Sequence, residues 1–297
     1  MEFFTANIRN PNTREAYYRA VCGFASWCDE YGVELERVEP SIVAAYIEQL
    51  MRQVNSRTGR PMADATVKQH LAGIRMLFDY LTTGGVVGYN PAAAVRGPKI
   101  VVEKGKTPVL SADDARLLLD SIDCTRISGL RDRALIGVMV FAFARVGATL
   151  KMNVGDLYEN GRTLWLRLHE KGGRYHEMPC HHKLAQYLDE YVEAAGIRER
   201  RSSPLFCTLG RTRTLTEFRL TRQDAWAMVK RRARAAGVST EICCHSFRAT
   251  GITTFVKNGG TPENARKLAA HRDQKTTNMY IRVDDELSQE EVERVRI

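Results

Sequence analysis

The chain has 297 residues, of which 44% are hydrophobic and 27% are charged, as in a soluble globular protein and unlike a disordered or fibrous one. Its length suffices for two ordinary domains. The sequence contains no apolar run near the roughly 18–20 residues that span a bilayer, and its start, MEFFTANIRN, has neither the basic nor the apolar region of a secretory signal. We therefore expect a cytoplasmic protein with no membrane partner.

The seven cysteines are an odd number and include no Cys-x-x-Cys pair, which fits a reducing compartment better than a disulfide framework. Two short clusters combine Cys with His, at 180–182 and at 243–245. Neither has the paired spacing of a structural zinc site. We interpret the thiols as buried or incidental and expect no bound metal.

The net charge of +9 is unevenly distributed along the chain. Residues 1–98 hold 10 basic and 10 acidic side chains, residues 99–282 hold 32 and 19, and residues 283–297 hold 2 and 6. The three parts therefore carry 0, +13 and −4, which add up to +9. A basic middle indicates a polyanionic partner, although a solvated basic surface would produce the same balance, and the acidic end is expected to lie elsewhere.

Residues 1–98 show apolar positions at helical spacing and are expected to form an all-helical domain. Asn12 and Glu15 form a capping-box pattern ahead of the first helix, and two further helices are expected near 43–54 and 64–84. Residues 99–108 belong to a stretch rich in Lys, Gly and Pro that lacks helical periodicity. This composition predicts an extended linker.

Residues 109–282 mix helical and strand patterns and are expected to form a second domain. Capping-box patterns begin helices after Ser111 and Thr221, and apolar periodicity predicts helices near 130–144, 182–195, 222–235, 246–258 and 262–270. Leucine alternates with other residues from 164 to 169 and a Lys-Gly-Gly-Arg turn follows, which predicts a β-hairpin over 163–179 with Lys171 at its tip. The expected fold is mainly α, with a helical first domain and a mixed α+β second domain that contains a small antiparallel sheet.

Six polar residues of the second domain stand out because their surroundings do not explain them: Arg145, Lys171, His245, Arg248, His271 and Tyr280. Arg145 ends an apolar helix, and His245 and Arg248 lie three apart on one helix face. Taken singly, each has a structural explanation, because an Arg at a helix end favours the helix dipole, a Lys in a turn is solvated and a Tyr on a short helix packs. The prediction depends on their order and spacing together.

The six side chains suit phosphoryl transfer on a DNA phosphodiester. Attack concentrates negative charge on the two non-bridging oxygens, which planar guanidinium groups such as Arg145 and Arg248 neutralise bidentately. A phenol, whose ordinary pKa is about 10, becomes a nucleophile when cationic neighbours favour its anion, and Tyr280 is the candidate. Lys171 would protonate the leaving 5′-oxygen and His245 would assist proton transfer. His271 would hydrogen-bond the phosphate. No carboxylate cluster accompanies these residues, so we expect no magnesium and no cofactor.

The order Arg … Lys … His-x-x-Arg … His … Tyr resembles the catalytic set of the tyrosine recombinase (phage integrase) family. The segments that carry it are FAFARVGATLKMNVGDL, HEKGGRYH, CHSFRATGITTF and LAAHRDQKTTNMYIR, and the last two are especially similar to the family's pattern. The resemblance covers roughly residues 106–282, each of the six candidates occupies a family motif position, and residues 1–98 resemble the family's core-binding (SAM-like) domain. The chain looks like the simpler Xer-like or transposon-borne enzymes, which have no additional arm-binding domain.

The resemblance implies site-specific recombination that integrates, excises or resolves DNA through a 3′-phosphotyrosyl bond at Tyr280 and a Holliday junction, without metal or ATP. It also implies a C-shaped clamp on double-stranded DNA. The protein would be a monomer or weak dimer when free. On synapsed sites it would form a homotetramer, or a tetramer shared with a related recombinase, and half of the protomers would be active at a time. The acidic segment 283–297 is similar to the C-terminal segment that docks on a neighbouring protomer.

One position departs from the family pattern. The third residue after the first catalytic Arg is commonly acidic in the family, and here it is Ala148. The departure removes none of the groups that would contact phosphate. It leaves open which residue orients Arg145.

DNA contacts outside the site are expected on the helix at 222–235, at Lys230, Arg231, Arg232 and Arg234. A solvated helix face is an equal alternative for each of them. A type IB topoisomerase would have similar chemistry without joining two sites, but the helical first domain and the acidic end favour a recombinase. A DNA-binding regulator on a decayed integrase scaffold would bind without cutting; the six intact polar positions argue against it and Ala148 is its only support.

Overall fold

The computed structural model describes residues 3, 8–54, 59–100, 105, 107–170, 173 and 175–281. Lys171 and the acidic segment 283–297 therefore lie outside the described residues, as do 101–104 of the expected linker. The chain divides into two compact units, Met1–Val102 and Glu103–Ile297, and the division falls within the segment expected to link them. Across the described ranges, no helix is both long enough and apolar enough to span a bilayer.

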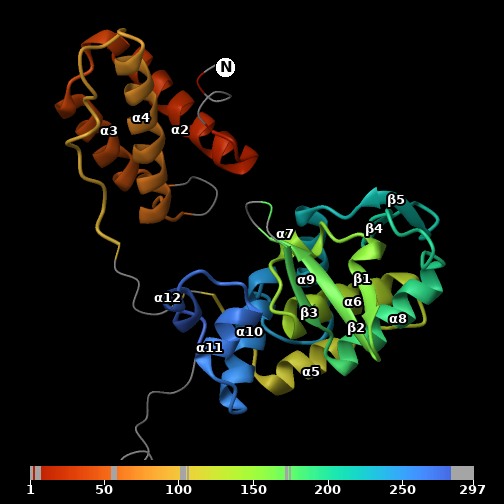
Figure 1. Ribbon diagram of the computed structural model, residues 1–297. Coiled ribbons are helices and arrows are strands. Elements are labelled where there is room, and N and C mark those ends of the chain that lie inside the picture. The colour runs from red at the N-terminus through yellow and green to blue at the C-terminus, as the bar shows by residue number, and fades with distance from the viewer. Residues whose placement is uncertain are drawn as a thin grey trace, which may run out of the picture. The chain divides into compact units, whose positions relative to one another are not determined.

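The described residues of the first unit form three long helices, α2 (Pro11–Glu30), α3 (Pro40–Arg52) and α4 (Asp64–Thr83), with a short 3₁₀ turn η1 (Leu35–Arg37) after α2 (Figure 1). Their apolar stripes meet in one buried core that includes Phe24, Val43, Leu71 and Phe78. Such helices are stable because packing of an apolar face compensates for the entropy that ordering the chain costs. The helical fold expected for this part of the chain is confirmed.

The first helix begins at a different cap from the expected one. Asn10, and not Asn12, is the N-cap, and its side-chain oxygen accepts hydrogen bonds from the backbone N–H groups of Asn12 and Thr13. Pro11 then occupies the first helical position, where its missing N–H has no partner to lose. The Asn-Pro pair sets the helical backbone two residues before the pattern at Asn12 and Glu15 could do so.

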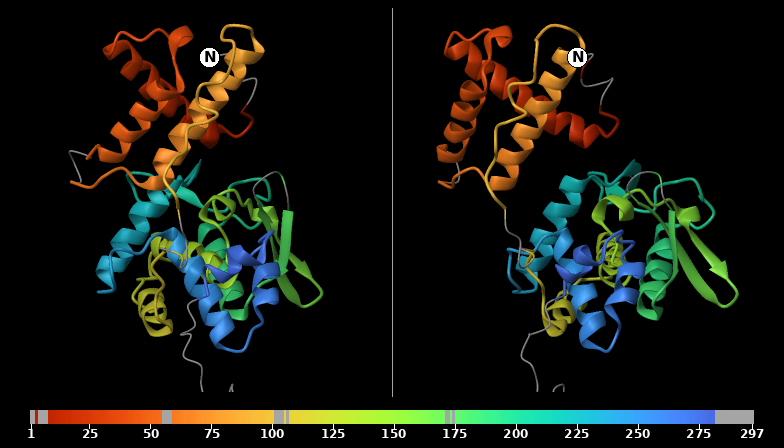
Figure 2. Two further views of the ribbon diagram at one scale, coloured as in Figure 1. Left: turned by 90° about the vertical axis from the view of Figure 1, so that its left-hand side faces the viewer. Right: turned by 60° about the vertical axis from the view of Figure 1, so that its left-hand side comes forward.

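The second unit is built around one buried helix. Its helices are α5 (Ala112–Asp120), α6 (Ile127–Phe141), α7 (Val146–Thr149), α8 (His182–Ala195), α9 (Arg222–Ala235), α10 (Cys244–Lys257), α11 (Pro262–Leu268) and α12 (Gln274–Asn278), with a 3₁₀ turn η2 (Val154–Asp156). Helix α6 has buried residues on all sides and packs against both α8 and α10, as expected of a helix that is apolar all round. Figure 1 shows α8 towards one end of this unit and α10, α11 and α12 gathered at the other, and these three helices stay together in both views of Figure 2.

Two small antiparallel sheets complete the part of the second unit that the structure describes. Strands β1 (Leu157–Asn160), β2 (Thr163–His169) and β3 (Tyr175–Pro179) lie in the order β1-β2-β3, and β4 (Cys207–Leu209) pairs with β5 (Leu215–Arg219). The predicted hairpin is confirmed as β2–β3, with Leu166 opposite Met178 and Leu168 opposite His176. Strands β1, β4 and β5 were not predicted, because strands of 3 to 5 residues offer too few positions for an alternating pattern.

Helix α6 ends earlier than the expected 130–144, and Arg145 begins a new helix instead of ending the old one. The helix stops at Phe141, and Phe143 adopts a left-handed backbone with a φ of 49°, which residues other than glycine rarely do. The Arg248 guanidinium donates a hydrogen bond to the carbonyl oxygen of Phe143. This tertiary contact holds the break, and Arg145 becomes the N-cap of α7.

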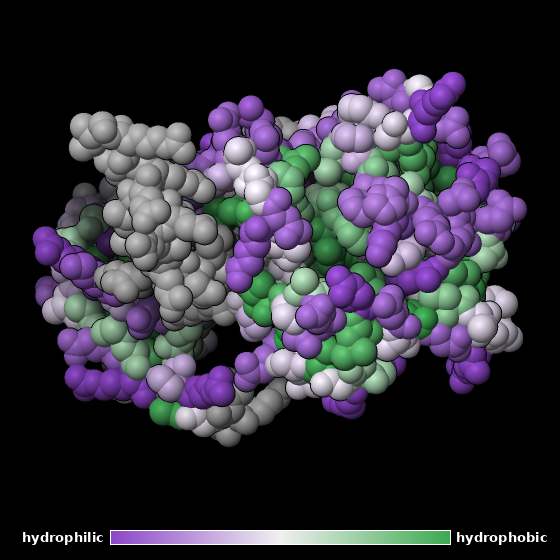
Figure 3. Space-filling model, turned by 90° about the horizontal axis from the view of Figure 1, so that it is seen from below, coloured by the Kyte–Doolittle hydropathy of each residue, from purple (hydrophilic) through white to green (hydrophobic). Residues whose placement is uncertain are grey.

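A cavity of 680 Å³ lies among α5, α6, α8 and α10. Its lining includes the apolar residues Val140, Phe141, Phe143 and Phe255, and also Arg116 and Lys183. Figure 3 shows, on the face that it presents, hydrophobic residues grouped between hydrophilic ones. This cavity combines apolar with charged lining, and none of the candidate site residues that the structure describes lines it.

Candidate active site

Five of the six predicted site residues come from four separate segments of the second unit. Arg145 is the N-cap of α7, and His245 and Arg248 lie in the first turns of α10. His271 follows α11, and Tyr280 follows α12. His245 and His271 contact Tyr280, and the charge of Arg145 acts on His245, Arg248 and His271.

Arg248 is completely buried, with 0% of its surface exposed. Its guanidinium donates to the carbonyl oxygens of Phe143 and Ala269, the latter at 2.6 Å. The Nε atom is also buried and has no hydrogen-bond partner among the described residues. A buried cation with a free donor costs stability, so Arg248 offers a fixed place for an anion.

Tyr280 lies between two histidines. Its hydroxyl is hydrogen-bonded to Nε2 of His245, and its ring is stacked on the ring of His271, with 5.4 Å between centroids and 15° between planes. The backbone is also fixed, because the hydroxyl of Thr253 on α10 donates to the carbonyl oxygen of Tyr280 at 2.6 Å. The phenol oxygen is therefore held against the helix that carries His245 and Arg248.

His271 is 4% exposed and is positioned by its Nδ1, which lies 2.9 Å from the hydroxyl oxygen of Thr277. Its Nε2 is buried and unpaired within the described part of the chain. The preceding residue, Ala270, has a φ of 49° in the left-handed region, which turns the chain sharply at the end of α11. His271 thus provides a second buried polar atom without a partner beside the phenol.

Burial and the nearby cations lower the pKa values of the two histidines of the site. Burial, followed by the charges of Arg248 and Arg145, lowers the pKa of His245 below its usual 6.5. The same causes, with a smaller contribution from His245, lower the pKa of His271 to about 3. Burial and the like charge of Arg145 lower the pKa of Arg248 to about 10. At neutral pH the site therefore combines neutral imidazoles with charged guanidinium groups.

Glu170 is a site residue that the sequence analysis missed. Its Oε2 accepts a hydrogen bond from Nη1 of Arg145 at 2.6 Å. A signal for it exists in the sequence, because the alternation of Leu164, Leu166 and Leu168 continues to position 170 and predicts an inward-facing side chain there. An acid at an inward-facing strand position needs a cationic partner.

Lys171 lies outside the described residues, so its place relative to the phenol stays a prediction. The strands on either side of it are tied to the site. Glu170 contacts Arg145 just after β2, and Nε2 of His176 on β3 lies 3.0 Å from the carbonyl oxygen of Leu268 at the end of α11. The hairpin is thereby connected to the segments that carry Arg145 and His271.

The basic residues predicted to contact DNA on α9 make contacts within the protein. Lys230 donates to the carbonyl oxygens of Thr240 and Ile242 at 2.5 and 2.8 Å. Arg231 and Arg232 both donate to the carboxylate of Asp132, which is fully buried. The fourth, Arg234, is exposed. Their role in DNA binding stays a prediction, and for the first three it would compete with these contacts.

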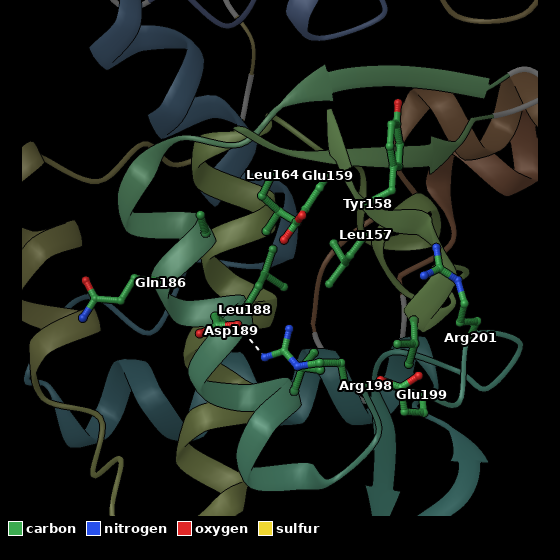
Figure 4. A pocket seen from close by; sticks show the side chains of 13 residues that line it. Leu157, Tyr158, Glu159, Leu164, Gln186, Leu188, Asp189, Arg198, Glu199 and Arg201 are labelled. Carbon is green, nitrogen blue, oxygen red and sulfur yellow. Dashed lines mark hydrogen bonds and ion pairs between the residues drawn. The ribbon is translucent and has the colours of Figure 1, made fainter. Parts of the chain in front are cut away.

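A pocket of 730 Å³ lies elsewhere in the second unit, between β1, β2 and α8 (Figure 4). Arg198 and Asp189 face each other within it and form an ion pair at 2.5 Å. None of the five predicted site residues that the structure describes lines this pocket. The candidate active site is therefore defined by the cluster around Tyr280 and not by this pocket.

The chain is similar in sequence to known tyrosine recombinases. The tyrosine recombinase XerD of Listeria monocytogenes is 27% identical over 273 residues, covering 92% of this chain and 88% of that protein. The XerD of Pseudomonas putida is 26% identical over 275 residues, covering 92% of this chain and 87% of that protein.

Solved structures share the fold at lower sequence identity. The XerH recombinase in a post-cleavage complex with its difH substrate matches with a TM-score of 0.71 and 17% identity over 92% of this chain and 76% of that chain. A lambda integrase tetramer bound to a Holliday junction matches with a TM-score of 0.70 and 17% identity over 96% of this chain and 76% of that chain. The model of the phage integrase family matches residues 108–286, which include all six predicted site residues. The chain therefore belongs to the phage integrase family, the family of tyrosine recombinases that its motifs resemble.

Proposed function

We propose that this protein is a site-specific DNA recombinase in which Tyr280 attacks a phosphodiester. The phenol oxygen forms a bond to phosphorus, the bond from phosphorus to the 5′-oxygen breaks, and a 3′-phosphotyrosyl intermediate and a 5′-hydroxyl result. A 5′-hydroxyl from a second strand then reverses the step and passes the strands through a Holliday junction. Because each step exchanges one phosphodiester for another, no energy-supplying cofactor is consumed.

One observation carries this proposal. Nε of Arg248 and Nε2 of His271 are buried without a partner among the described residues. The His271 ring stacks on the Tyr280 ring, and Tyr280 acts electrostatically on Arg248. A DNA phosphate beside the phenol would satisfy both atoms and meet the positive charge of Arg145. Donors fixed in advance at the position where charge develops stabilise a transition state, and removing one typically costs on the order of 10²–10³ in rate.

The protonation of the site supports a proton path. A neutral His245, whose Nε2 is hydrogen-bonded to the phenol oxygen, can accept the phenol proton as the bond to phosphorus forms. A neutral His271 whose Nδ1 accepts from Thr277 keeps a proton on Nε2 and can donate it to a phosphate oxygen. Lys171 supplies the proton for the leaving 5′-oxygen in this scheme.

We also propose that the protein acts on double-stranded DNA as a homotetramer. The segment 283–297 would dock on a neighbouring protomer, and its charge of −4 suits contact with protein better than with phosphate. The cavity lined by Val140, Phe143 and Phe255 would accept its apolar residues, and Arg116 and Lys183 in the same lining would attract its acids. The segment combines both types, with Val283, Leu287 and Val292 among six carboxylates.

A plasmid assay separates this proposal from its two rivals. A duplex that the wild-type protein selects from a random-sequence library is placed twice on one supercoiled plasmid. The recombinase should exchange the flanking segments, and Tyr280→Phe should not. Relaxation of a plasmid that lacks the selected duplex would instead indicate a topoisomerase, and binding of the duplex without strand cleavage would indicate a regulator.

A further inference from the structure

We infer that Glu170 is the residue that positions Arg145, in place of the acidic residue that position 148 lacks. The inference rests on the role proposed above for Arg145 as a ligand of the scissile phosphate. Glu170 would not touch DNA itself. It would fix the direction in which the guanidinium presents its remaining donors.

The contact has the geometry of a charge-assisted hydrogen bond, with 2.6 Å between Nη1 of Arg145 and Oε2 of Glu170. The two side chains differ in exposure, at 38% for Arg145 and 8% for Glu170. A buried carboxylate needs a partner that compensates for its lost hydration. The carboxylate is therefore the fixed member of the pair, and the arginine, which is open to solvent, is the member that it holds.

The place of Glu170 in the sheet argues against an incidental surface pair. Leu166 and Leu168 are 0% and 1% exposed, and Glu170, two residues further on, is 9% exposed. The buried face of β2 thus continues past the end of the strand to Glu170. An apolar residue at this position would pack without the electrostatic cost of burying a carboxylate. An acid at this position is explained by the cation that it meets.

Because position 148 carries no acid, another part of the chain has to position Arg145. Ala148 lies three residues after Arg145, one turn along α7, and its methyl group is buried. An acid there would reach Arg145 from the same helix, and the methyl group cannot. Because α7 packs against β2, the end of that strand brings a carboxylate to the same arginine from a neighbouring element.

The arrangement has a consequence for the hairpin. Glu170 directly precedes Lys171, the proposed general acid, in the sequence. The ion pair between Arg145 and Glu170 therefore links the proposed phosphate ligand to the end of β2, one residue before Lys171. Loss of the carboxylate should therefore affect the chemical step more than the binding of DNA.

The test is a double-mutant cycle on the full-length protein. The probe is the selected duplex with a nick beside the scissile phosphate, so that the short leaving strand diffuses away and the covalent adduct accumulates. At saturating protein we expect Glu170→Ala to lower the rate constant of adduct formation by on the order of 10²-fold, as for a misplaced catalytic group. Glu170→Gln, which keeps an acceptor but no charge, should lie between Glu170→Ala and the wild type.

Non-additivity separates positioning from a general structural effect. In an Arg145→Ala background, Glu170→Ala should lower the rate constant by no more than about twofold, because residues that act through one another are not additive. The matched control is Glu177→Ala, which breaks the ion pair with Arg167 on the same hairpin and should cleave like the wild type. With protein in excess over DNA, the rate constant at saturation does not depend on the fraction of protein that folds, and the melting temperature shows whether a variant has lost stability.

The inference about Glu170 would be overturned if Glu170→Ala cleaved like the wild type. It would also be overturned if the fold-losses in rate constant of Glu170→Ala and Arg145→Ala multiplied in the double mutant. An Arg145→Ala variant that cleaves like the wild type would overturn the role proposed for Arg145. The two failures are therefore distinguishable in one set of measurements.

Discussion

Nε2 of His245 is hydrogen-bonded to the phenol oxygen of Tyr280, although 35 residues separate the two in the chain. Helix α10 presents the imidazole from its first turn, and the hydroxyl of Thr253 on the same helix holds the backbone of Tyr280. A base and a nucleophile in hydrogen-bond contact are the pair that covalent catalysis requires.

The rate of strand cleavage should keep its value as the pH falls through 6.5. Burial and the charges of Arg248 and Arg145 lower the pKa of His245, so the imidazole stays neutral and able to accept the phenol proton below the ordinary pKa of a histidine. The measurement is the rate constant for adduct formation on the nicked duplex between pH 8 and pH 5. A rate that falls to half at or above pH 6.5 would contradict the assignment of His245 as the base.

His271 should make the folded protein sensitive to acid. Its pKa is about 3 in the folded state and about 6.5 when unfolded, so the unfolded chain binds more protons between these values. The free energy of unfolding is therefore fully maintained above pH 6.5 and falls as the pH drops towards 3, by ~2 kcal/mol between pH 6.5 and pH 5.

Urea unfolding at pH 7 and pH 5 measures this loss. His271→Gln should lose less stability than the wild type over that interval, by ~1–2 kcal/mol. His245 and the carboxylates titrate in both proteins and cancel in the comparison. Equal losses would show that His271 is not held neutral by the fold.

Gly251→Ala should damage the site without removing any of its polar groups. A Cβ at this position of α10 would lie closer than 3.0 Å to the carbonyl oxygen of Val140 and to the ring of Phe143. The added methyl group would push α10 from α6 and disturb the hydrogen bond from Arg248 to Phe143, at a cost of about 1–3 kcal/mol in stability.

Cleavage rate and urea unfolding check this prediction together. Gly251→Ala should lower both the rate constant and the stability. Gly88→Ala is the control, because a Cβ there meets nothing within 4 Å, and it should change neither. A Gly251→Ala variant with wild-type cleavage would mean that the α6–α10 contact does not set the position of Arg248.

Lys171→Ala should slow cleavage by on the order of 10²–10⁴-fold if the lysine is the general acid. The loss should nearly vanish on a duplex in which sulfur replaces the leaving 5′-oxygen, because a thiolate, with an ordinary pKa of about 8.5, leaves without a proton. Lys151→Ala, which removes an exposed lysine elsewhere in the second unit, serves as the control. An equal loss on both duplexes would assign Lys171 another role.

Local patterns predicted the parts of the fold that local interactions determine. Ser111 caps α5 and Thr221 caps α9, each by accepting from the backbone N–H of the Asp three residues on, as their capping patterns indicate. The left-handed turn at Phe143 and the early end of α6 were not predictable in this way. They depend on a hydrogen bond from Arg248, 105 residues away in the sequence.

The candidate site shows the same division between local pattern and distant contact. The identities of Arg145, His245, Arg248, His271 and Tyr280 follow from motif order. In the structure, His245 is hydrogen-bonded to the phenol oxygen, His271 stacks on the phenol ring, and Tyr280 acts electrostatically on Arg248. The pairing of Arg145 with Glu170 was not predicted, although the alternation along β2 marks position 170 as inward-facing. Which cation meets a buried acid is decided by how separate elements pack, and a single sequence does not display that packing.

The covalent bond to DNA tests the central claim most directly. The wild-type protein is incubated with the nicked duplex, digested with a protease, and the peptide that carries nucleotide is identified by mass spectrometry. We predict attachment at the phenol oxygen of Tyr280, no adduct with Tyr280→Phe at unchanged DNA affinity and melting temperature, and a normal adduct with Tyr89→Phe in the first unit. A nucleotide attached to any other residue, or an adduct that persists in Tyr280→Phe, would contradict the account.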